Sequence, residues 1–215
     1  MKLTRLEFEQ RIENGALPLL LIGMSNVGKS FRARQLRDEK GFGMVSIDEE
    51  IEKKLGLAGL EALASWMGFP HQGGYAPKEK VYLQTEQAMM QNLKLPQGKN
   101  FVVDSTGSLI YLGNKILETL KGNYLIVHLE VVESMIPLMT DKFFTRPKSV
   151  VWGGMFERGP KEAVEVAYRR CYPEWLQFRL GKYKQLADIS VSGELSIDPK
   201  VTIDRFLEEI LEKLG

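Results

Sequence analysis

The sequence predicts an α/β fold in which helices cover a parallel sheet. Two observations support this prediction. Short apolar runs alternate along the chain with longer stretches of helical periodicity, and a glycine-rich turn at residues 23–30 follows the first apolar run. The length of 215 residues suits one compact domain with a substantial apolar core, so residues 1–215 are expected to form a single unit.

The expected strands are short apolar runs bounded by turn residues. They cover residues 18–22, 44–47, 101–103, 125–129 and 188–191. The first reads Pro-Leu-Leu-Leu-Ile, which is typical of a strand buried on both faces.

The expected helices have apolar residues three or four positions apart, with capping residues at several ends. They cover residues 4–13, 29–39, 49–55, 61–67, 78–93, 132–139, 162–180 and 199–214, and another helix contains residues 116–120. Asp48 is placed to cap the third of them, and Asp198 followed by Pro199 is placed to begin the last.

Two segments lack periodicity and are expected to be loops. Residues 71–77 contain Gly73, Gly74 and Pro77, which mark an irregular connection. Residues 141–160 carry several more glycines and prolines. A segment of this length without periodicity indicates a surface loop that could close over a ligand.

Composition narrows the class of protein. The chain is 44% hydrophobic and 27% charged with a formal charge of +1, which favours a globular protein without a nucleic-acid-binding surface. No apolar run is long enough to span a membrane. The single cysteine, Cys171, and the lack of a leader pattern at the start predict a cytoplasmic setting.

The strongest motif is a phosphate loop. Residues 23–30 read GMSNVGKS and fit G-x-x-x-x-G-K-[ST] between an expected strand and an expected helix. The glycines allow backbone N–H groups to surround a phosphate, Lys29 adds a positive charge, and Ser30 offers a hydroxyl to Mg²⁺. This motif predicts ATP binding. The expected nucleotide-binding residues are Gly23, Ser25, Asn26, Val27, Gly28, Lys29, Ser30 and Phe31.

Two carboxylates follow expected strands. Asp104 ends the run Phe-Val-Val and is placed to reach Mg²⁺ together with Ser30, or else to cap the helix after it. Asp48 follows Val-Ser-Ile and is placed to orient or deprotonate an acceptor hydroxyl, or else to cap its own helix.

These parts, in this order, resemble the shikimate kinase family. The resemblance includes the phosphate loop, residues 46–56, residues 104–108, Arg146 with Pro147, and Arg179 followed by Tyr183 and Leu-Ala-Asp at residues 186–188. It spans most of the chain. The family implies a three-layer α/β/α P-loop kinase fold with a five-stranded parallel sheet in the order 2-3-1-4-5, an acceptor-binding insertion at about residues 48–95 and a mobile lid at about residues 141–165.

The resemblance also implies roles for single residues. Asp48 is similar to the acceptor-contacting aspartate of the family, Arg179 to its acceptor-binding arginine, and Arg146 to its lid arginine near the phosphates. Gly107 falls in the turn that faces the acceptor. Lys29, Asp48 and Arg146 are therefore the expected catalytic residues.

The chain departs from the family at three places. Ser46 stands where the family has its first, metal-associated aspartate, whereas Asp104 supplies a carboxylate one strand away. Ala76 stands in place of an arginine that follows an aromatic residue, and Lys78 nearby could supply a point charge but not a planar fork. The glycine-rich turn of the family reads Thr-Gly-Ser at residues 106–108, which adds side chains beside the acceptor.

The sequence thus predicts a kinase that uses ATP and Mg²⁺ to phosphorylate a small molecule bound by Asp48, Lys78, Gly107 and Arg179. The acceptor could be shikimate, or a polyol, sugar acid or nucleotide. A nucleotide-binding regulatory protein without kinase turnover remains the alternative from another class.

Overall fold

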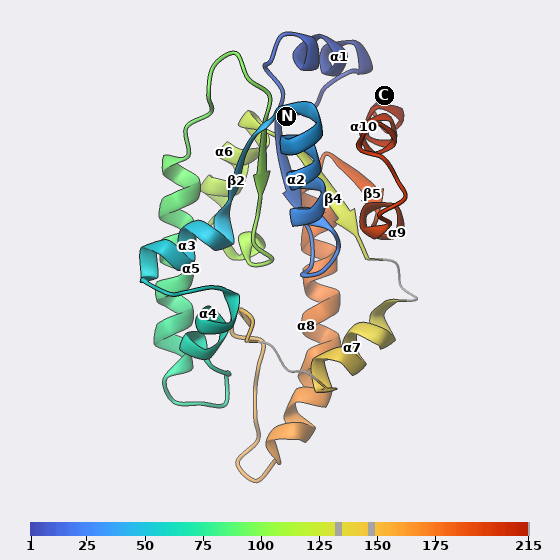
Figure 1. Cartoon of the computed structure of the whole chain (residues 1–215). Coiled ribbons are helices and arrows are strands. Elements are labelled where there is room, and N and C mark those ends of the chain that lie inside the picture. Colours follow the sequence, from blue (N-terminus) through green and yellow to red (C-terminus); the bar gives the residue numbers. More distant parts are fainter. Residues whose placement is uncertain (132–134, 146–148, 215) are drawn as a thin grey trace.

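A computed structural model describes residues 1–131, 135–145 and 149–214 of the chain (Figure 1). In this part the strands form one parallel sheet of five, in the order β2-β3-β1-β4-β5. The strands are β1 (Pro18–Ile22), β2 (Gly43–Ser46), β3 (Phe101–Asp104), β4 (Leu125–Glu130) and β5 (Ile189–Ser192). The expected strand order and all five expected strands are confirmed, with shifts of at most one residue at their ends.

Helices lie on both faces of this sheet, which gives three layers (Figure 1). They are α1 (Arg5–Glu13), α2 (Lys29–Lys40), α3 (Ile47–Leu55), α4 (Leu60–Met67), α5 (Tyr75–Asn92), α6 (Asn114–Asn123), α7 (Ile136–Thr145), α8 (Val164–Leu186), α9 (Gly193–Ile197), α10 (Ile203–Glu212) and the 3-10 turn η1 (Leu109–Tyr111). Helix α2 packs on β1, β2 and β3, whereas α6 and α8 pack on β4 from the other face.

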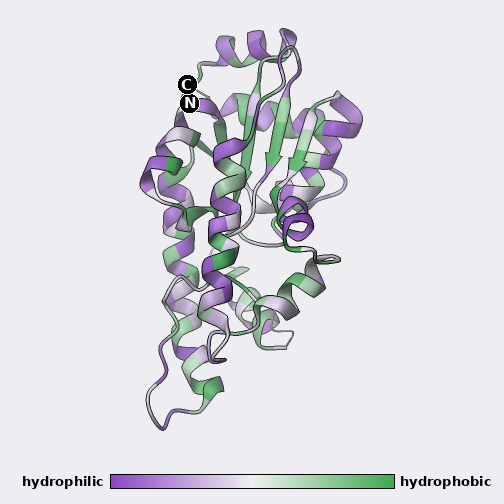
Figure 2. Ribbon diagram, turned by 90° about the vertical axis from the view of Figure 1, so that its left-hand side faces the viewer, coloured by the Kyte–Doolittle hydropathy of each residue, from purple (hydrophilic) through white to green (hydrophobic). Residues whose placement is uncertain are grey.

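The central strands are apolar throughout because both of their faces are covered. Leu19, Leu20, Leu21 and Ile22 are fully buried, and Figure 2 shows the hydrophobic strands enclosed by helices with polar outer surfaces. Burying such a side chain contributes about 1.5–3 kcal/mol relative to leaving it exposed. The sheet is therefore the centre of the hydrophobic core.

The parallel register brings the carboxyl ends of the strands to one edge. Asp104 at the end of β3 lies opposite Leu21 of β1 on one side and opposite Ser46 of β2 on the other. On the far side of β1, Ile22 lies opposite His128. In open parallel sheets, ligands bind outside this edge.

The two long helices extend beyond the sheet. Helices α5 and α8 continue past its carboxyl edge and, with α4, α7 and the segment before α8, form a lower part of the molecule (Figure 1). An aromatic cluster fills this part, with ring centroids 4.3–6.3 Å apart. Its rings are Phe143, Phe156, Trp152, Tyr168, Tyr172 and Trp175.

The expectation of one surface loop at residues 141–160 is wrong in two respects. The first residues of that range belong to α7, and Trp152 is 1% exposed. The Trp152 ring packs in the aromatic cluster, and one carboxylate oxygen of Glu79 on α5 accepts hydrogen bonds from the Trp152 and Gly153 N–H groups at 2.6 and 3.0 Å. Nothing in the sequence pattern shows this contact between distant segments.

Three helix starts also differ from the expectations. Helix α5 begins at Tyr75, so Pro77 lies in its first turn instead of in a loop. Helix α3 begins at Ile47 after Ser46, so Asp48 is inside the first turn and is not the cap. Helix α10 begins at Ile203, where the Thr202 hydroxyl accepts from the Arg205 N–H at 3.2 Å.

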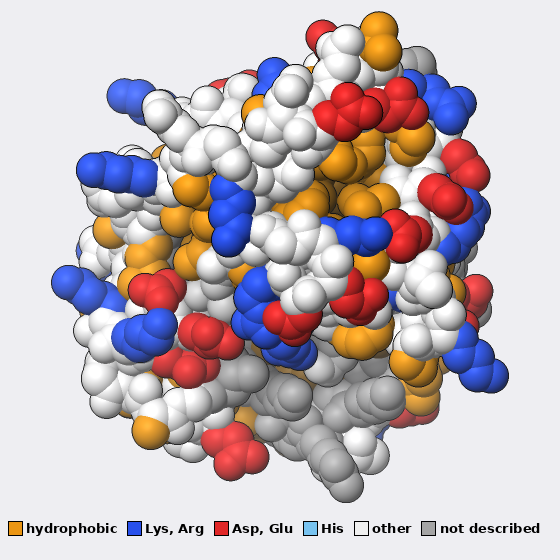
Figure 3. All heavy atoms as spheres, turned by 45° about the horizontal axis from the view of Figure 1, so that its top comes forward, with side chains coloured by type: hydrophobic (Ala, Val, Ile, Leu, Met, Phe, Trp, Pro, Cys, Tyr) orange, Lys and Arg blue, Asp and Glu red, His pale blue; other side chains and the backbone are white. Residues whose placement is uncertain are grey.

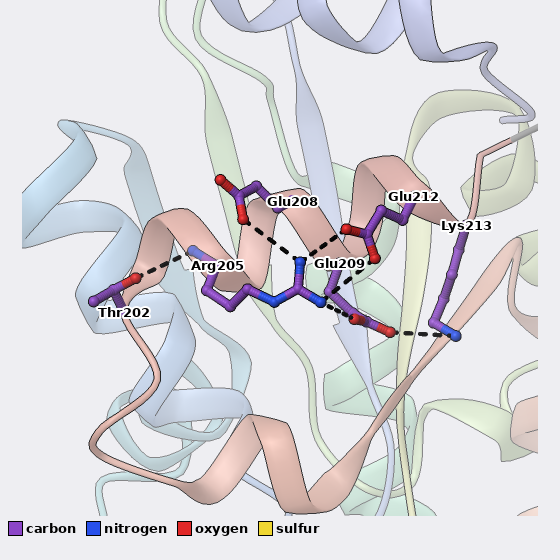
Figure 4. A network of polar contacts seen from close by, with 6 residues as sticks. All are labelled: Thr202, Arg205, Glu208, Glu209, Glu212 and Lys213. Atoms are coloured by element: carbon purple, nitrogen blue, oxygen red, sulfur yellow. Dashed lines mark hydrogen bonds and ion pairs between the residues drawn. The ribbon is translucent and has the colours of Figure 1, made fainter.

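The exposed side of α10 carries a network of ion pairs (Figure 4). The Arg205 guanidinium contacts Glu208, Glu209 and Glu212, and Lys213 contacts Glu209 at 3.3 Å. Arg205 is 42% exposed, so each pair contributes little to the free energy of unfolding, about 0–1 kcal/mol.

The surface in Figure 3 has interspersed positive and negative side chains, with hydrophobic side chains in the hollow between them. No large region of one charge covers this face. Among the described residues, no helix is both long and apolar enough to cross a membrane.

Candidate functional site

The phosphate loop joins β1 to α2 at the carboxyl edge of the sheet, as expected. Its backbone turns through left-handed conformations at Asn26 and Gly28, with φ of 65° and 92°. Gly28 also lies so close to α9 that a Cβ atom there would be 2.5 Å from the Ser196 carbonyl oxygen. Ser25 and Asn26 are exposed, whereas Val27 packs inward. The outer part of the loop is therefore open to solvent, while Val27 and Gly28 pack against the rest of the protein.

Lys29 holds this loop from within. Its ammonium group donates to the Gly23 and Met24 carbonyl oxygens at 3.1 and 2.9 Å, and its side chain is 8% exposed. Burial lowers the pKa of Lys29, while the nearby Asp104 and Asp48 act in the opposite direction. The charges of Lys29, Asp48 and Asp104 therefore influence one another, and their roles in a shared site remain a prediction.

Asp104 and Ser30 meet beside the loop. Burial raises the pKa of Asp104, and a hydrogen bond from Ser30 together with the charge of Lys29 offsets part of this effect. The Asp104 Oδ1 atom is buried without a hydrogen-bond partner among the described residues. A buried carboxylate oxygen without a partner, next to the Ser30 hydroxyl, suits Mg²⁺, which takes few protein ligands beside phosphate oxygens and water. The residues thus fit the expected ion, although no cluster of three His, Cys, Asp or Glu side chains occurs in the described part of the chain.

Asp48 lies at the start of α3, next to the phosphate loop. The Tyr82 hydroxyl of α5 donates to its Oδ1 atom at 3.2 Å. Burial raises the pKa of Asp48, whereas the charge of Lys29 and the Tyr82 hydrogen bond lower it. A carboxylate fixed by a phenol and placed near the phosphate-binding lysine can orient a hydroxyl or accept its proton.

Arg179 and Gly107 are also brought together. The Arg179 Nη2 group and the Tyr183 hydroxyl both donate to the Gly107 carbonyl oxygen, and the guanidinium stacks 4.5 Å from the Trp175 ring centroid. Arg179 is 3% exposed, but its Nε atom has no partner among the described residues. The arginine is therefore held rigidly beside the turn that was expected to face the acceptor.

Replacing Gly107 with alanine is expected to displace this arginine. A Cβ atom at residue 107 would lie 2.6 Å from the Arg179 Nη2 atom, so the guanidinium must shift and its hydrogen bonds to the Gly107 carbonyl and the Tyr183 hydroxyl are disturbed. We expect a loss of about 1–3 kcal/mol in the free energy of unfolding, measured by urea denaturation. Gly181→Ala, at an open position two residues after Arg179 in α8, should instead stabilise the protein by about 0.5–1 kcal/mol. Equal effects of the two changes would contradict the close approach.

Three other expected site residues have different outcomes. Lys78 is half-buried in the first turns of α5, one and two helical turns before Tyr82 and Glu86 on the same side of the helix. Its acceptor role remains a prediction. Arg146 lies outside the described residues. Phe31 is half-buried next to Arg32, with its ring centroid 4.9 Å from the guanidinium carbon.

Sequence reasoning missed the role of Arg32. This side chain is fully buried and donates to four backbone carbonyl oxygens, those of Leu195, Ser196, Asp198 and Val201, and to the Gln35 side chain. It thereby fixes the chain from α9 onward against α2 and the base of the phosphate loop. A long-range contact of this kind leaves no local pattern in the sequence.

Sequence reasoning also missed Glu86, which is fully buried on α5. Thr106 and Ser108 donate hydrogen bonds to its carboxyl group. These two side chains were expected beside the acceptor, but they point toward α5. One signal was present in the sequence, since Glu86 lies four residues from Tyr82 and from Met90 on the buried stripe of its helix.

His128 is buried beneath the same edge, as its place within a strand predicted. Its ring stacks on Tyr183 with centroids 5.4 Å apart, and its Nδ1 atom lies 3.3 Å from the Ser190 hydroxyl. Burial lowers the pKa of His128 to about 4, so the ring is neutral at physiological pH.

No protein-family model and no curated protein matches this sequence. Solved structures do match its fold. The shikimate kinase from Aquifex aeolicus vf5 aligns with a TM-score of 0.55 at 18% identity over 90% of this chain and 96% of that chain. The shikimate kinase from Bacteroides thetaiotaomicron aligns with a TM-score of 0.58 at 16% identity over 91% and 98%. The shikimate kinase from Acinetobacter baumannii, in complex with shikimate, aligns with a TM-score of 0.54 at 19% identity over 95% of both. The chain therefore has the P-loop kinase fold of shikimate kinases.

Proposed function

We propose that this protein binds ATP with Mg²⁺ at residues 23–31 and transfers the γ-phosphoryl group to a hydroxyl group of a small molecule. The observation that carries the proposal is the grouping of Lys29, Asp104 and Asp48 at the carboxyl edge of the sheet, coupled through their charges. The fold shared with shikimate kinases supports the same reaction class.

The proposed roles follow from these positions. Backbone N–H groups of the loop and the Lys29 ammonium group bind the β- and γ-phosphates. Ser30 and Asp104 would hold Mg²⁺, which would supply positive charge against the phosphate oxygens. The acceptor oxygen forms a bond to the γ-phosphorus while the bond to the β,γ-bridging oxygen breaks, so ADP leaves. Asp48 orients the acceptor hydroxyl and takes its proton.

The acceptor is proposed to lie between Asp48, Gly107 and Arg179, with Lys78 at its edge. Residues 48–95 form the acceptor side of the site in this proposal, and residues 141–165, including Arg146, form its lid. Because the Acinetobacter baumannii enzyme was solved with shikimate, shikimate is the first acceptor to test. Sugar acids, polyols and nucleotides follow, because the family arginine is replaced by Ala76.

The test is acceptor-dependent release of ADP. Wild-type protein with ATP and Mg²⁺ should release ADP with at least one of shikimate, gluconate, simple polyols and nucleoside monophosphates. With that acceptor, Asp48→Asn should lower kcat by roughly 100-fold while ATP binding by calorimetry changes little, because the amide cannot accept the proton. ATP binding without ADP release across the panel would favour the regulatory alternative, and lack of ATP binding would refute the proposal.

A further inference from the structure

Glu86 belongs to a closed ring of hydrogen-bond contacts behind the proposed acceptor site. One carboxyl oxygen contacts the Thr106 hydroxyl, and the other lies 2.6 Å from the Ser108 hydroxyl. The two hydroxyl oxygens lie 2.8 Å from each other. All three side chains are buried, with exposures of 0%, 1% and 4% for Glu86, Thr106 and Ser108. We call these three residues the Glu86 ring.

The Glu86 ring has three oxygen–oxygen contacts, and each needs one proton to be a hydrogen bond. The Thr106 and Ser108 hydroxyls supply one proton each, whereas an ionised carboxylate supplies none. With Glu86 ionised, one contact would bring lone pairs together at hydrogen-bond distance in a buried site, which costs free energy. A protonated carboxyl group supplies the third proton. The geometry therefore closes completely only when Glu86 is neutral.

The groups around the Glu86 ring also favour the protonated form of Glu86. Burial raises the pKa of Glu86 to about 7, although the two hydroxyls and the charge of Arg179 act in the opposite direction and Asp48 adds to the rise. Tyr82 on the same helix and Tyr183 on α8 also face this carboxyl group. The proton on Glu86 is therefore exchanged near neutral pH.

The Glu86 ring fixes the backbone turn between its two hydroxyl residues. The Ser108 N–H group donates to the Thr106 hydroxyl at 3.0 Å, so Gly107 lies between two residues anchored on α5. On its other side, the Gly107 carbonyl oxygen accepts from Arg179 and Tyr183 of α8. The Glu86 ring on α5 and the hydrogen bonds from α8 therefore both hold the Gly107 peptide, which faces the acceptor in the proposed site.

We propose that Glu86 is a positioning residue, which in its protonated form holds the Gly107 turn against Arg179 and on losing its proton releases the turn and weakens acceptor binding. The acceptor part of this inference rests on the proposed function, whereas the proton part rests on the Glu86 ring alone. The expected signature is an acceptor KM that rises above about pH 7 while kcat changes little.

Glu86→Gln tests both parts. The amide can donate to one hydroxyl and accept from the other, so the ring closes at every pH. Because the pKa of Glu86 is raised from 4.5 to about 7, the folded wild-type protein binds more protons than the unfolded chain between these values. The unfolding midpoint of the wild type, relative to that of Glu86→Gln, should therefore fall as the pH rises from 4.5 to about 7. Above about pH 7 the difference between the two midpoints should be constant. The acceptor KM of the variant should not rise above pH 7.

A matched control is Glu9→Gln, an exposed glutamate on α1, whose unfolding midpoint should follow the wild type at every pH. Carbon NMR of wild-type glutamate carboxyl groups gives a reading that does not depend on any variant. One of these groups should titrate near pH 7, and titration of all of them near 4.5 would overturn the proton part. If that part holds but the acceptor KM has the same pH dependence in wild type and Glu86→Gln, the positioning role is refuted. Absence of turnover with any acceptor refutes the proposed function instead.

Discussion

Replacing Lys29 with alanine is expected to lower ATP-dependent phosphoryl transfer by roughly 1000-fold or more. The ammonium group is the positive charge that the loop aims at the β- and γ-phosphates, and charged groups that stabilise a transferring phosphoryl group have effects of this size. Because burial lowers the pKa of Lys29, removing the side chain also relieves the cost of burying its charge, which offsets part of the loss of its hydrogen bonds to the Gly23 and Met24 carbonyl oxygens. The measurement is ADP release with whichever acceptor of the panel supports turnover, together with calorimetric titration of ATP.

Lys99→Ala is the matched control. Lys99 is exposed and lies just before the amino end of β3, whereas the phosphate loop lies at the carboxyl edge of the sheet. This variant should keep wild-type rates and wild-type ATP affinity. The circular dichroism spectrum of Lys29→Ala should match that of the wild type. A folded Lys29→Ala protein with near-normal transfer would show that the loop does not bind the transferring phosphates.

Replacing Arg32 with alanine is expected to destabilise the protein by about 3–5 kcal/mol. The substitution removes a fully buried guanidinium group and leaves the carbonyl oxygens of Leu195, Ser196, Asp198 and Val201 without this donor. It also removes the stacking on Phe206, whose ring centroid lies 5.4 Å from the guanidinium carbon. Guanidinium chloride denaturation followed by fluorescence measures this loss.

Arg205→Ala is the control for this second change. Arg205 makes ion pairs with three glutamates, but it does so on the exposed side of α10, so its loss should cost less than about 1 kcal/mol. Comparable losses for the two arginines would contradict the view that burial decides the difference. Because the Ser196 carbonyl lies against Gly28, Arg32→Ala should also weaken ATP binding in the fraction that remains folded.

Features with local causes could be predicted from the sequence. The apolar run of β1 and the glycines before α2 fix their own conformations, so the strands and the phosphate loop were found within one residue. The placement of Asp104 and Asp48 near the loop followed from a rule about the edges of parallel sheets. Predicting these features required only the neighbouring residues and the fold class.

Features that depend on distant partners could not be predicted. Residues 149–153 contain no periodic pattern, and the backbone N–H groups of Trp152 and Gly153 are held by Glu79, some 70 residues earlier in the chain. The side chains of Thr106 and Ser108 were expected to face a ligand, since their partner Glu86 is on another element. In both cases one carboxyl group on α5 contacts a segment far along the chain, and its own sequence position does not show that partner.

The pairing of Ser46 with Asp104 has a consequence for comparing such proteins. Neighbouring parallel strands lie about 5 Å apart, so in the proposed magnesium site an acidic group could move from one strand end to the other and still serve the same ion. Comparison by alignment column would record this exchange as one loss and one unrelated gain. Superposed coordinates would show instead that the two carboxylates lie close together, on neighbouring strands.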